Sequence, residues 1–337
     1  MAGLALGIYY AQDKVIVGSI DASTGKIDLI DKKKAPSDGI ENIYLASKII
    51  TDNFSNVDVV GVCQAVPSTI KILDRHDVSY GRIGLGIGPR NWTDMNVVSE
   101  LQEALRRFGS PLDSKTCAFP IISQVGATAL GEYNSRFPSA FAGPNAALNR
   151  RQTGNIIHIV ADHGIGVAIL NQGHLFRGTA VPNIGHMLIR PIAGEIYKEC
   201  RHHPERSCLN AMASLGAIEA KWGIDAKKFE VSTDTDMIAE IALYFAQAIT
   251  NLIYLSSPNQ IIIGGRMSKN KLFIKQIDRL IRMDMAGNNG IIPEPFDSLL
   301  DTSNYLSAQR EDDAGVLGAC RLAADWAKDD KVSTLRS

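Results

Sequence analysis

A short run of histidine and cysteine residues places the tightest constraint on how this chain folds. His186 is followed fourteen residues later by the pattern Cys200-x-x-His203-x4-Cys208. Two imidazoles and two thiols are the nitrogen and sulfur ligands of a closed tetrahedral zinc site. We expect a structural Zn²⁺ to bind here and to add to the free energy of folding. The spacing leaves His202 as an alternative fourth ligand, and a catalytic zinc or a loop without metal as alternative interpretations.

Length and composition favour two domains with moderate apolar cores. The chain has 337 residues, 45% of them apolar. Basic and acidic residues number 35 and 36, so the charge balance gives no reason to expect a nucleic-acid partner. No run of about 18 uncharged apolar residues is present, so we expect no membrane partner. Three cysteines outside the cluster (Cys63, Cys117 and Cys320) have apolar neighbours, which is typical of the reducing cytoplasm, where we expect this protein.

Strands and helices alternate along the chain in two successive series, which is typical of two α/β domains. The first series contains strands over 4–10 and 14–20, joined by the polar tip Ala11-Gln12-Asp13. Its other elements are a helix near 38–54, a strand at 57–63, a helix from Thr93 or Asp94 to Arg107, a strand at 116–122 and a helix at 125–133. Residues 134–154 are rich in Pro, Gly, Asn and Ala and predict a surface excursion.

The second series opens with an apolar stretch over 156–170, which we expect to form a long hairpin by turning at 171–173. The remaining elements are helices over 211–222 and 237–256, a strand over 260–264, a helix over 271–282 and a last helix from about 314 to 328. We place an N-terminal α/β domain at 1–119 and a C-terminal α/β domain, with the zinc loop, at 120–313. The last helix, about 314–330, is expected to pack back on the first domain.

Several motifs together resemble one known family. Asn183-Ile-Gly-His186, the Cys/His cluster and Leu215-Gly-Ala-Ile-Glu-Ala-Lys-Trp-Gly223 are similar, in this order, to motifs of the bacterial-type fructokinases of the ROK family (repressor, open reading frame, kinase). Residues 129–132, 261–265 and 314–319 match further family motifs. The resemblance implies two actin-like, ribonuclease H-like domains around a central cleft, a structural zinc beside the sugar site and often a homodimer. It also implies ATP-dependent phosphorylation of a hexose.

The chain departs from this family at the first loop that holds the phosphates of ATP there. This loop matches residues 9–14, where the family's glycines are absent and Gln12, Asp13 and Lys14 take the last three places. Without glycine the backbone N–H groups approach a phosphate less closely, and the Asp13 carboxylate repels it. A solvated hairpin tip is the simpler interpretation of this turn.

The second phosphate loop of the family matches residues 161–167, where Asp162 and His163 precede Gly164 and Gly166. The adenosine-side glycine turn is kept as 264–265 (Gly264 and Gly265). A carboxylate that faces a triphosphate in a low-dielectric cleft is strongly repulsive. Because an aspartate has entered both phosphate loops, we expect ATP and Mg²⁺ not to bind.

Three carboxylates of the family are replaced by amides. Gln124 stands at the position of the catalytic base, and Asn183 and Asn210 stand at two glutamates that hold the sugar hydroxyls. Glutamine accepts no proton at accessible pH, whereas an amide keeps two hydrogen-bonding ends and loses the charge. We infer that the cleft still binds a polar small molecule, and an anionic one would explain the loss of negative charge.

Asp162 and His163 form a candidate acid/base pair. An adjacent carboxylate and imidazole suit proton transfer, although neighbours in an extended strand point to opposite faces and a structural role is the alternative. Arg90 and Asn91 are candidate ligand contacts, because they end a segment that resembles the family stretch near the sugar. Arg266 follows the glycine turn, and we expect it to face solvent.

These observations leave three functions open. The first is a ROK-fold enzyme that has lost phosphoryl transfer and performs acid/base chemistry on a polar small molecule, with an anion as one option. The second is a pseudokinase that binds such a ligand without turnover. The third is a residual ATP-dependent fructokinase or hexose kinase. Fold alone does not separate them, because function resides in the site.

Overall fold

The chain divides into two compact units, each described here by itself. The computed structural model describes residues 3–67, 77–84, 90–112, 117–140, 146–178, 180–192, 200, 207–294, 296–301 and 305–334. Unit 1 takes in Met1–Asn149, Arg177–Pro182 and Glu311–Ser337, and unit 2 takes in Arg150–Phe176 and Asn183–Arg310. Unit 1 thus continues past residue 119, where the sequence suggested a boundary, because the helix after that point packs within unit 1.

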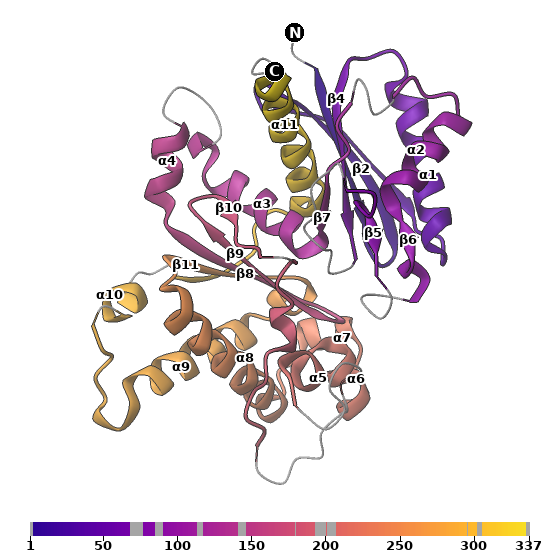
Figure 1. The fold of residues 1–337 in the computed structure, drawn as a ribbon. Coiled ribbons are helices and arrows are strands. Elements are labelled where there is room, and N and C mark those ends of the chain that lie inside the picture. Colours follow the sequence, from indigo (N-terminus) through magenta and orange to yellow (C-terminus); the bar gives the residue numbers. More distant parts are fainter. Residues whose placement is uncertain are drawn as a thin grey trace. The chain divides into compact units, whose positions relative to one another are not determined.

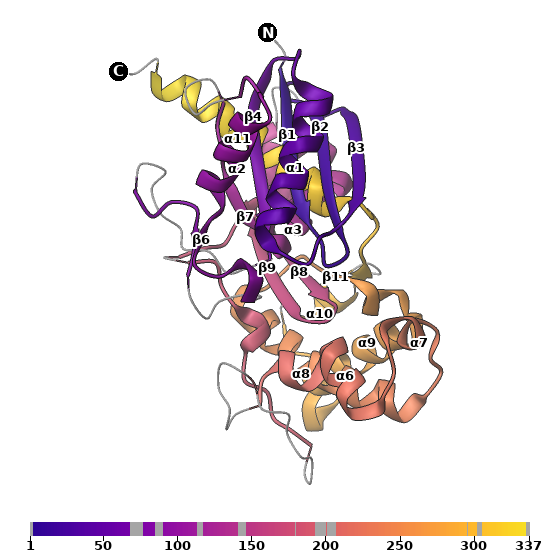
Figure 2. The same ribbon diagram turned by 90° about the vertical axis from the view of Figure 1, so that its right-hand side faces the viewer.

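Unit 1 is built on a five-stranded sheet in the order β3-β2-β1-β4-β7 (Figure 1 and Figure 2). Its strands are β1 (Leu4–Tyr10), β2 (Lys14–Asp21), β3 (Ile27–Lys34), β4 (Val59–Val66) and β7 (Ile121–Ser123). Strands β1, β2 and β3 are antiparallel neighbours, whereas β1, β4 and β7 run parallel. Helices α1 (Gly39–Phe54) and α2 (Val97–Arg107) cover one face, and α3 (Gln124–Arg136) and α11 (Ala314–Thr334) cover the other (Figure 2).

Unit 2 repeats this topology, with the order β10-β9-β8-β11-β12. Its strands are β8 (Asn155–Ala161), β9 (Ile165–Asn171), β10 (His174–Leu175), β11 (Gln260–Gly264) and β12 (Leu306–Ala308). Its helices are α5 (Leu209–Ala213), α6 (Leu215–Trp222), α7 (Ala226–Val231), α8 (Thr235–Ser256), α9 (Lys271–Ala286) and α10 (Phe296–Asp301). Three antiparallel strands followed by two parallel ones therefore occur in both units.

The smaller elements connect these layers. They are the strands β5 (Arg82–Ile83) and β6 (Met95–Asn96), the helix α4 (Ala146–Thr153), and the 3₁₀ turns η1 (Arg90–Trp92), η2 (Pro138–Ala140), η3 (Ile184–His186), η4 (Arg266–Lys269) and η5 (Gly287–Asn289). The described residues of the expected surface excursion, 134–140 and 146–154, are thus largely helical.

Helices α3 and α11 cross at two glycines. A Cβ atom on Gly131 would lie 1.8 Å from the carbonyl oxygen of Ala314, and one on Gly318 would lie 1.8 Å from that of Ala127. No side chain fits at such distances, so the backbones approach directly. These glycines lie in two of the motifs that resemble the family, and here they have a packing role.

Helix α8 is the central apolar helix of unit 2. By length and composition alone it could cross a membrane, and it is the one helix of the described residues for which this holds. Most of its apolar window is buried, and its side chains join the core that includes Ile157, Phe245 and Ile261. Its apolar character is therefore that of a core helix.

Helix α2 begins later than the sequence suggested. Asn96 caps it by accepting hydrogen bonds from the N–H groups of Val98 and Ser99, both at 3.1 Å. Asp94, one of the two expected first residues, has a φ of 59°, which is outside the helical region. The predicted start at Thr93 or Asp94 is therefore wrong by three or four residues.

The apolar stretch over 156–170 is two strands. The chain turns at 162–164, so β8 and β9 form the hairpin and β10 returns only briefly after 172–173. The predicted helix over 211–222 is likewise divided, because Ser214 ends α5 and caps α6 by accepting from Ala217 N–H at 3.2 Å. Strand β7 starts at Ile121, later than the expected 116.

Candidate functional site

The carboxyl ends of parallel strands are the usual ligand position in open α/β sheets. In unit 1 this edge carries a chain of neutral hydrogen bonds. Tyr10, the last residue of β1, donates its O–H to Gln64 Oε1 of β4 at 2.8 Å, and Gln64 Nε2 donates to the carbonyl of Val97 at 2.9 Å. Gln124, the first residue of α3, donates from Nε2 to the Tyr10 carbonyl. The position matched to the family's base therefore belongs to a network of amides, a phenol and backbone carbonyls.

This network carries no charge. Tyr10 and Gln64 are buried, and burial raises the pKa of the Tyr10 phenol well above its ordinary value, so its proton stays in place. The ring of Tyr10 lies 4.7 Å from that of Trp92, which limits its movement. Such a network can hydrogen-bond a polar ligand but accepts no proton near neutral pH. The sequence reasoning missed Tyr10 and Gln64, although a glutamine in the apolar strand Val59–Val66 is a recognisable signal.

The β1–β2 turn, which matches the first phosphate loop, is a solvent-exposed tip. Gln12, Asp13 and Lys14 are all exposed, and the Asp13 carbonyl accepts a hydrogen bond from the N–H of Ala35 at 2.9 Å. The turn is thus attached to the rest of unit 1 through its backbone. This arrangement agrees with the simple hairpin interpretation.

Arg90 and Asn91 lie in η1, beside the start of α1. Asn91 Nδ2 donates to the carbonyl of Ser37 at 2.7 Å, so its amide nitrogen helps to hold the chain ahead of α1. The side chain of Arg90 lies outside the described part of the chain, as do residues 85–89 before it. Ligand contact by either residue stays a prediction.

In unit 2 the equivalent edge carries an ion pair. Asp162, in the β8–β9 turn, accepts from Arg266 Nε at 3.0 Å on both carboxylate oxygens and from Arg266 Nη2 at 2.5 Å. Backbone N–H groups add to this, from His163 at 2.7 Å and from Arg266 at 3.3 Å. The expectation that Arg266 faces solvent is only partly right, because its side chain is 36% exposed but its guanidinium is paired with Asp162.

These contacts limit what Asp162 can do chemically. Burial raises its pKa, but the hydrogen bonds from Arg266 and from the His163 N–H outweigh burial and hold the pKa below its ordinary value. A carboxylate with a lowered pKa is a weak proton acceptor. His163 is exposed and lies in the turn, so the argument from opposite strand faces does not apply. The acid/base pair stays a prediction that the geometry makes less favourable.

Asn210 and Asn183, the two amides expected at the sugar, lie in different surroundings. Asn210 sits in the first turn of α5, and its Oδ1 accepts from the N–H of Ile165 at 2.8 Å, which fixes the end of the β8–β9 turn. Asn183 precedes η3, is exposed, and makes no capping hydrogen bond with its side chain. That Asn183 and Asn210 bind the same ligand as Gln124 of unit 1 stays a prediction.

The glycine turn after β11 is required by close packing. Gly265 has a φ of 78°, and a Cβ atom there would lie 2.4 Å from the carbonyl oxygen of Ala161. A Cβ atom on Gly264 would lie 2.0 Å from Gln309 Oε1. Gly164 and Gly166 lie in the β8–β9 turn and in β9. The turn at 264–265 therefore brings the backbone of η4 against the end of β8.

His186, Cys200 and Cys208 meet as the sequence predicts. Their ligand atoms all lie within 4.8 Å of one another, and His186 Nδ1 is 3.3 Å from Cys200 Sγ and 3.6 Å from Cys208 Sγ. Tetrahedral zinc with ordinary bond lengths places such nitrogen and sulfur atoms about 3.5 Å apart. The three residues thus fit a metal ion. His203 and the alternative His202 lie outside the described residues.

The cluster is built into the start of α5. Cys208 caps this helix, since its Sγ accepts from the N–H of Ala211 at 3.4 Å, and its backbone bridges to Leu188. Burial raises the pKa of the Cys208 thiol to about 11, and the neighbouring Cys200 adds to the increase. A bound cation reverses this preference by favouring the thiolate. Cys208 of the cluster therefore lies two residues before Asn210, at the start of the same short helix.

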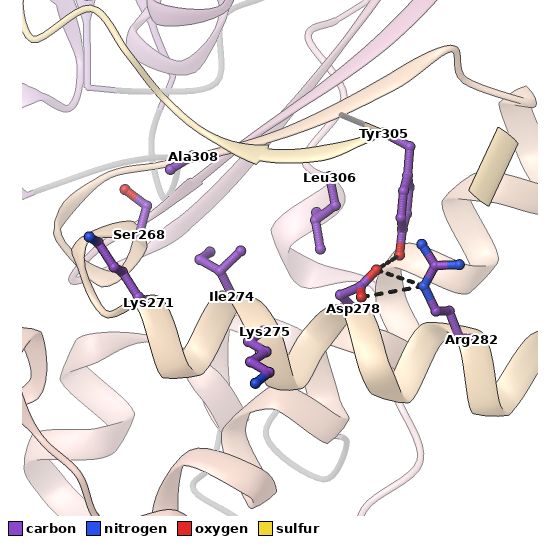
Figure 3. A pocket seen from close by; sticks show the side chains of 9 residues that line it. All are labelled: Ser268, Lys271, Ile274, Lys275, Asp278, Arg282, Tyr305, Leu306 and Ala308. Carbon is purple, nitrogen blue, oxygen red and sulfur yellow. Dashed lines mark hydrogen bonds and ion pairs between the residues drawn. The ribbon is translucent and has the colours of Figure 1, made fainter. Parts of the chain in front are cut away.

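A separate cavity of about 350 Å³ lies between α9 and β12 (Figure 3). Asp278 accepts from Arg282 Nε at 3.1 Å and from the Tyr305 hydroxyl, and Arg282 Nη2 donates to the carbonyl of Leu300 at 2.6 Å. Burial raises the pKa of Tyr305, and the Asp278 carboxylate raises it further. The contacts join α9, α10 and β12, and the lining includes none of the predicted site residues.

Comparison with known proteins identifies the family. A model described as "ROK family" matches residues 139–326, which is more than half of the chain. The chain therefore belongs to the ROK family, and its α/β fold is that of the ROK sugar kinases, the actin-like fold implied by the resemblance. The family assignment rests on sequence, and the two repeated sheets agree with it.

The proteins to which this chain is similar include sugar kinases and a transcriptional regulator. A protein of Bacillus subtilis (strain 168), provisionally named a fructokinase, is 30% identical over 205 residues, which span 60% of this chain and 61% of the relative. The ROK family glucokinase of Streptomyces griseus, solved with glucose and AMPPNP, is 19% identical with a TM-score of 0.66, over 96% of this chain and all of that one. A ROK family transcriptional regulator, a homologue of the E. coli MLC protein, is 16% identical with a TM-score of 0.69, over 97% of this chain and 78% of the other.

Proposed function

We propose that this ROK-family protein binds a sugar-like, polyhydroxylated ligand and does not transfer a phosphoryl group from ATP. One observation carries the proposal. Gln124, at the position of the family's base, is an amide whose nitrogen donates to the Tyr10 carbonyl. Phosphoryl transfer to a hydroxyl needs a group that takes or orients its proton. The Gln124 amide can still offer its carbonyl oxygen and its second N–H to a ligand, but it cannot take a proton as the carboxylate of a base does.

The other amides support a ligand site with little charge. Asn183 is exposed, and Asn210 keeps its Nδ2 end while Oδ1 holds the β8–β9 turn. Amides recognise hydroxyl groups and do not repel a carboxylate. The ligand class is thus a hexose or the corresponding sugar acid, and ligand binding without turnover is favoured over acid/base chemistry because Asp162 is held by Arg266.

A zinc ion is proposed as the structural part of this site. His186, Cys200 and Cys208 would hold it, with His203 as the fourth ligand that the spacing predicts. When bound, Zn²⁺ supplies folding energy and leaves no open position for water. The family resemblance predicts a homodimer, and the composition predicts a cytoplasmic location.

Fructokinase activity is the second candidate. It is favoured by the naming of the 30%-identical Bacillus subtilis relative, although that match spans 61% of the relative's length. Under this alternative a residue other than Gln124 would orient the sugar hydroxyl. Kinase activity then requires ATP to bind although each of the two loops matched to the family's phosphate loops carries an aspartate, Asp13 in one and Asp162 in the other.

A coupled ADP-release assay separates the two candidates. The purified protein is given ATP, Mg²⁺ and fructose, glucose or mannose, with an active ROK kinase as positive control. We expect no ADP release above the blank. In a separate calorimetric titration, we expect fructose or gluconate to bind the wild-type protein, and to bind Asn183→Ala at least fivefold more weakly. Sustained, sugar-dependent ADP release overturns the proposal, and failure of every sugar and sugar acid to bind removes its ligand class.

A further inference from the structure

We propose that Asp162 is an internal anion, whose carboxylate fills an anion-binding site built by the β8–β9 turn and η4 and thereby keeps phosphates out. The inference rests on the proposed function and deepens it, because it names the residue that excludes phosphate-bearing ligands. The site would take a phosphate oxyanion if the carboxylate were removed. The argument depends on the donors around Asp162 and on what holds them.

Four N–H donors converge on the carboxylate. Two are backbone groups, of His163 and Arg266, and two belong to the Arg266 guanidinium. Backbone N–H groups in a turn together with a guanidinium are what proteins use to bind phosphate. The carboxylate of Asp162 thus occupies the position that an external oxyanion would take.

The two backbone donors do not depend on the Asp162 carboxylate for their positions. The Asp162 carbonyl accepts from the N–H of Leu215 at 2.9 Å, and Asn210 Oδ1 accepts from the N–H of Ile165 at 2.8 Å. On the other side, the positive φ of Gly265 and its contact with Ala161 direct the N–H of Arg266 to the turn. These contacts involve backbone groups or other side chains. The site should therefore persist when the carboxylate is removed.

The location suits a ligand. The turn follows β8 and η4 follows β11, and these two strands are parallel neighbours, so the donors lie at their carboxyl ends. The Asp162 side chain is 29% exposed and that of Arg266 is 36% exposed, so solvent reaches the pair. Without the carboxylate, the site keeps the Arg266 guanidinium and the two backbone donors.

The test is an anion titration of Asp162 variants by calorimetry at low ionic strength. Asp162→Ser removes the carboxylate and leaves room, and Asp162→Asn keeps the side-chain shape if the first variant folds poorly. Inorganic tripolyphosphate and ATP are the two probes. We expect tripolyphosphate to bind Asp162→Ser at least tenfold more tightly than the wild-type chain. A similar gain for ATP places a nucleotide phosphate chain in the site, whereas a gain for tripolyphosphate alone restricts the site to free phosphates.

Two controls separate a built site from a general charge effect. Glu240→Ser removes a carboxylate from the Lys221–Glu240 pair, 2.6 Å long and in the same unit, and should give no gain. Adding Arg266→Met to Asp162→Ser should abolish the gain. The inference is overturned if neither Asp162 variant binds tripolyphosphate better than wild type, if Glu240→Ser gains as much, or if Arg266→Met leaves the gain intact. The titration uses no sugar and no turnover, so its failure leaves the proposed function standing.

Discussion

The first hairpin turn of each unit shows how one topology can carry two different environments. Both turns join the first and second strands of sheets with the same strand order, one at 11–13 and one at 162–164. The β1–β2 turn exposes Asp13 to solvent, whereas the β8–β9 turn holds Asp162 against Arg266. Each turn has an aspartate where the family resemblance predicts phosphate contacts. The comparison teaches that equal substitutions have unequal consequences, because the second aspartate is partly buried and paired with Arg266, whereas the first is exposed.

Metal removal should have the largest effect. Of the two turns, it should affect only the β8–β9 turn. Cys208 of the Cys/His cluster caps α5, and α5 carries Asn210, whose Oδ1 accepts a hydrogen bond from the N–H of Ile165. Loss of a structural zinc removes several kcal/mol of folding energy, so a strong chelator or Cys208→Ser should lower the melting temperature by about 5 °C or more. Hydrogen exchange measured by mass spectrometry should increase over 161–166 and 207–222.

The matched control is Cys117→Ser, a buried thiol of unit 1 outside the cluster. It should leave exchange over 161–166 unchanged. Equal effects of a chelator on 11–14 and on 161–166 would contradict the link between cluster and turn. A protein that holds no zinc by elemental analysis would contradict the zinc site itself.

Loss of Arg266 should come second in size. Arg266→Met removes the partner of a carboxylate that is 71% covered, and such losses cost about 1–3 kcal/mol. We expect the midpoint of denaturant unfolding to fall for Arg266→Met and to stay unchanged for Lys14→Met at the exposed first turn. A smaller loss in Arg266→Met than in Lys14→Met would show that the ion pair does not stabilise the second turn.

The pH dependence of stability should show the smallest difference between the turns. The pKa of Asp162 is lowered in the folded protein, so its contribution is present above the unfolded pKa of about 3.9 and is lost as the pH falls through the folded value. Wild type should therefore exceed Asp162→Asn in unfolding free energy at pH 6, and the difference should shrink as the pH falls below about 3.9. Asp13→Asn, at the exposed first turn, is the control and should match wild type at pH 6. If the difference in unfolding free energy between wild type and Asp162→Asn grew as the pH fell, the prediction would be wrong.

Local patterns predicted much of the fold. The strands at 4–10 and 14–20, the helix near 38–54 and the helix from 271 appear close to where the sequence suggested them, because apolar spacing and capping residues such as Asp38 act locally. The long hairpin over 156–170 was misjudged. Its turn at 162–164 interrupts an almost continuous apolar run, and hydrophobicity alone does not mark a turn there.

The sequence by itself determined the family, the two repeated series of strands and helices, and three members of the Cys/His cluster. These depend on residue type and on spacing along a short stretch of chain. Only the tertiary structure decided that Arg266 reaches Asp162, from 104 positions away, and that Gln124 joins Tyr10, from 114 positions away. Parallel strands that are distant in sequence bring these groups together, and no local pattern contains such pairings. The physical reason is that a side chain's charge and hydrogen bonds depend on its neighbours in space.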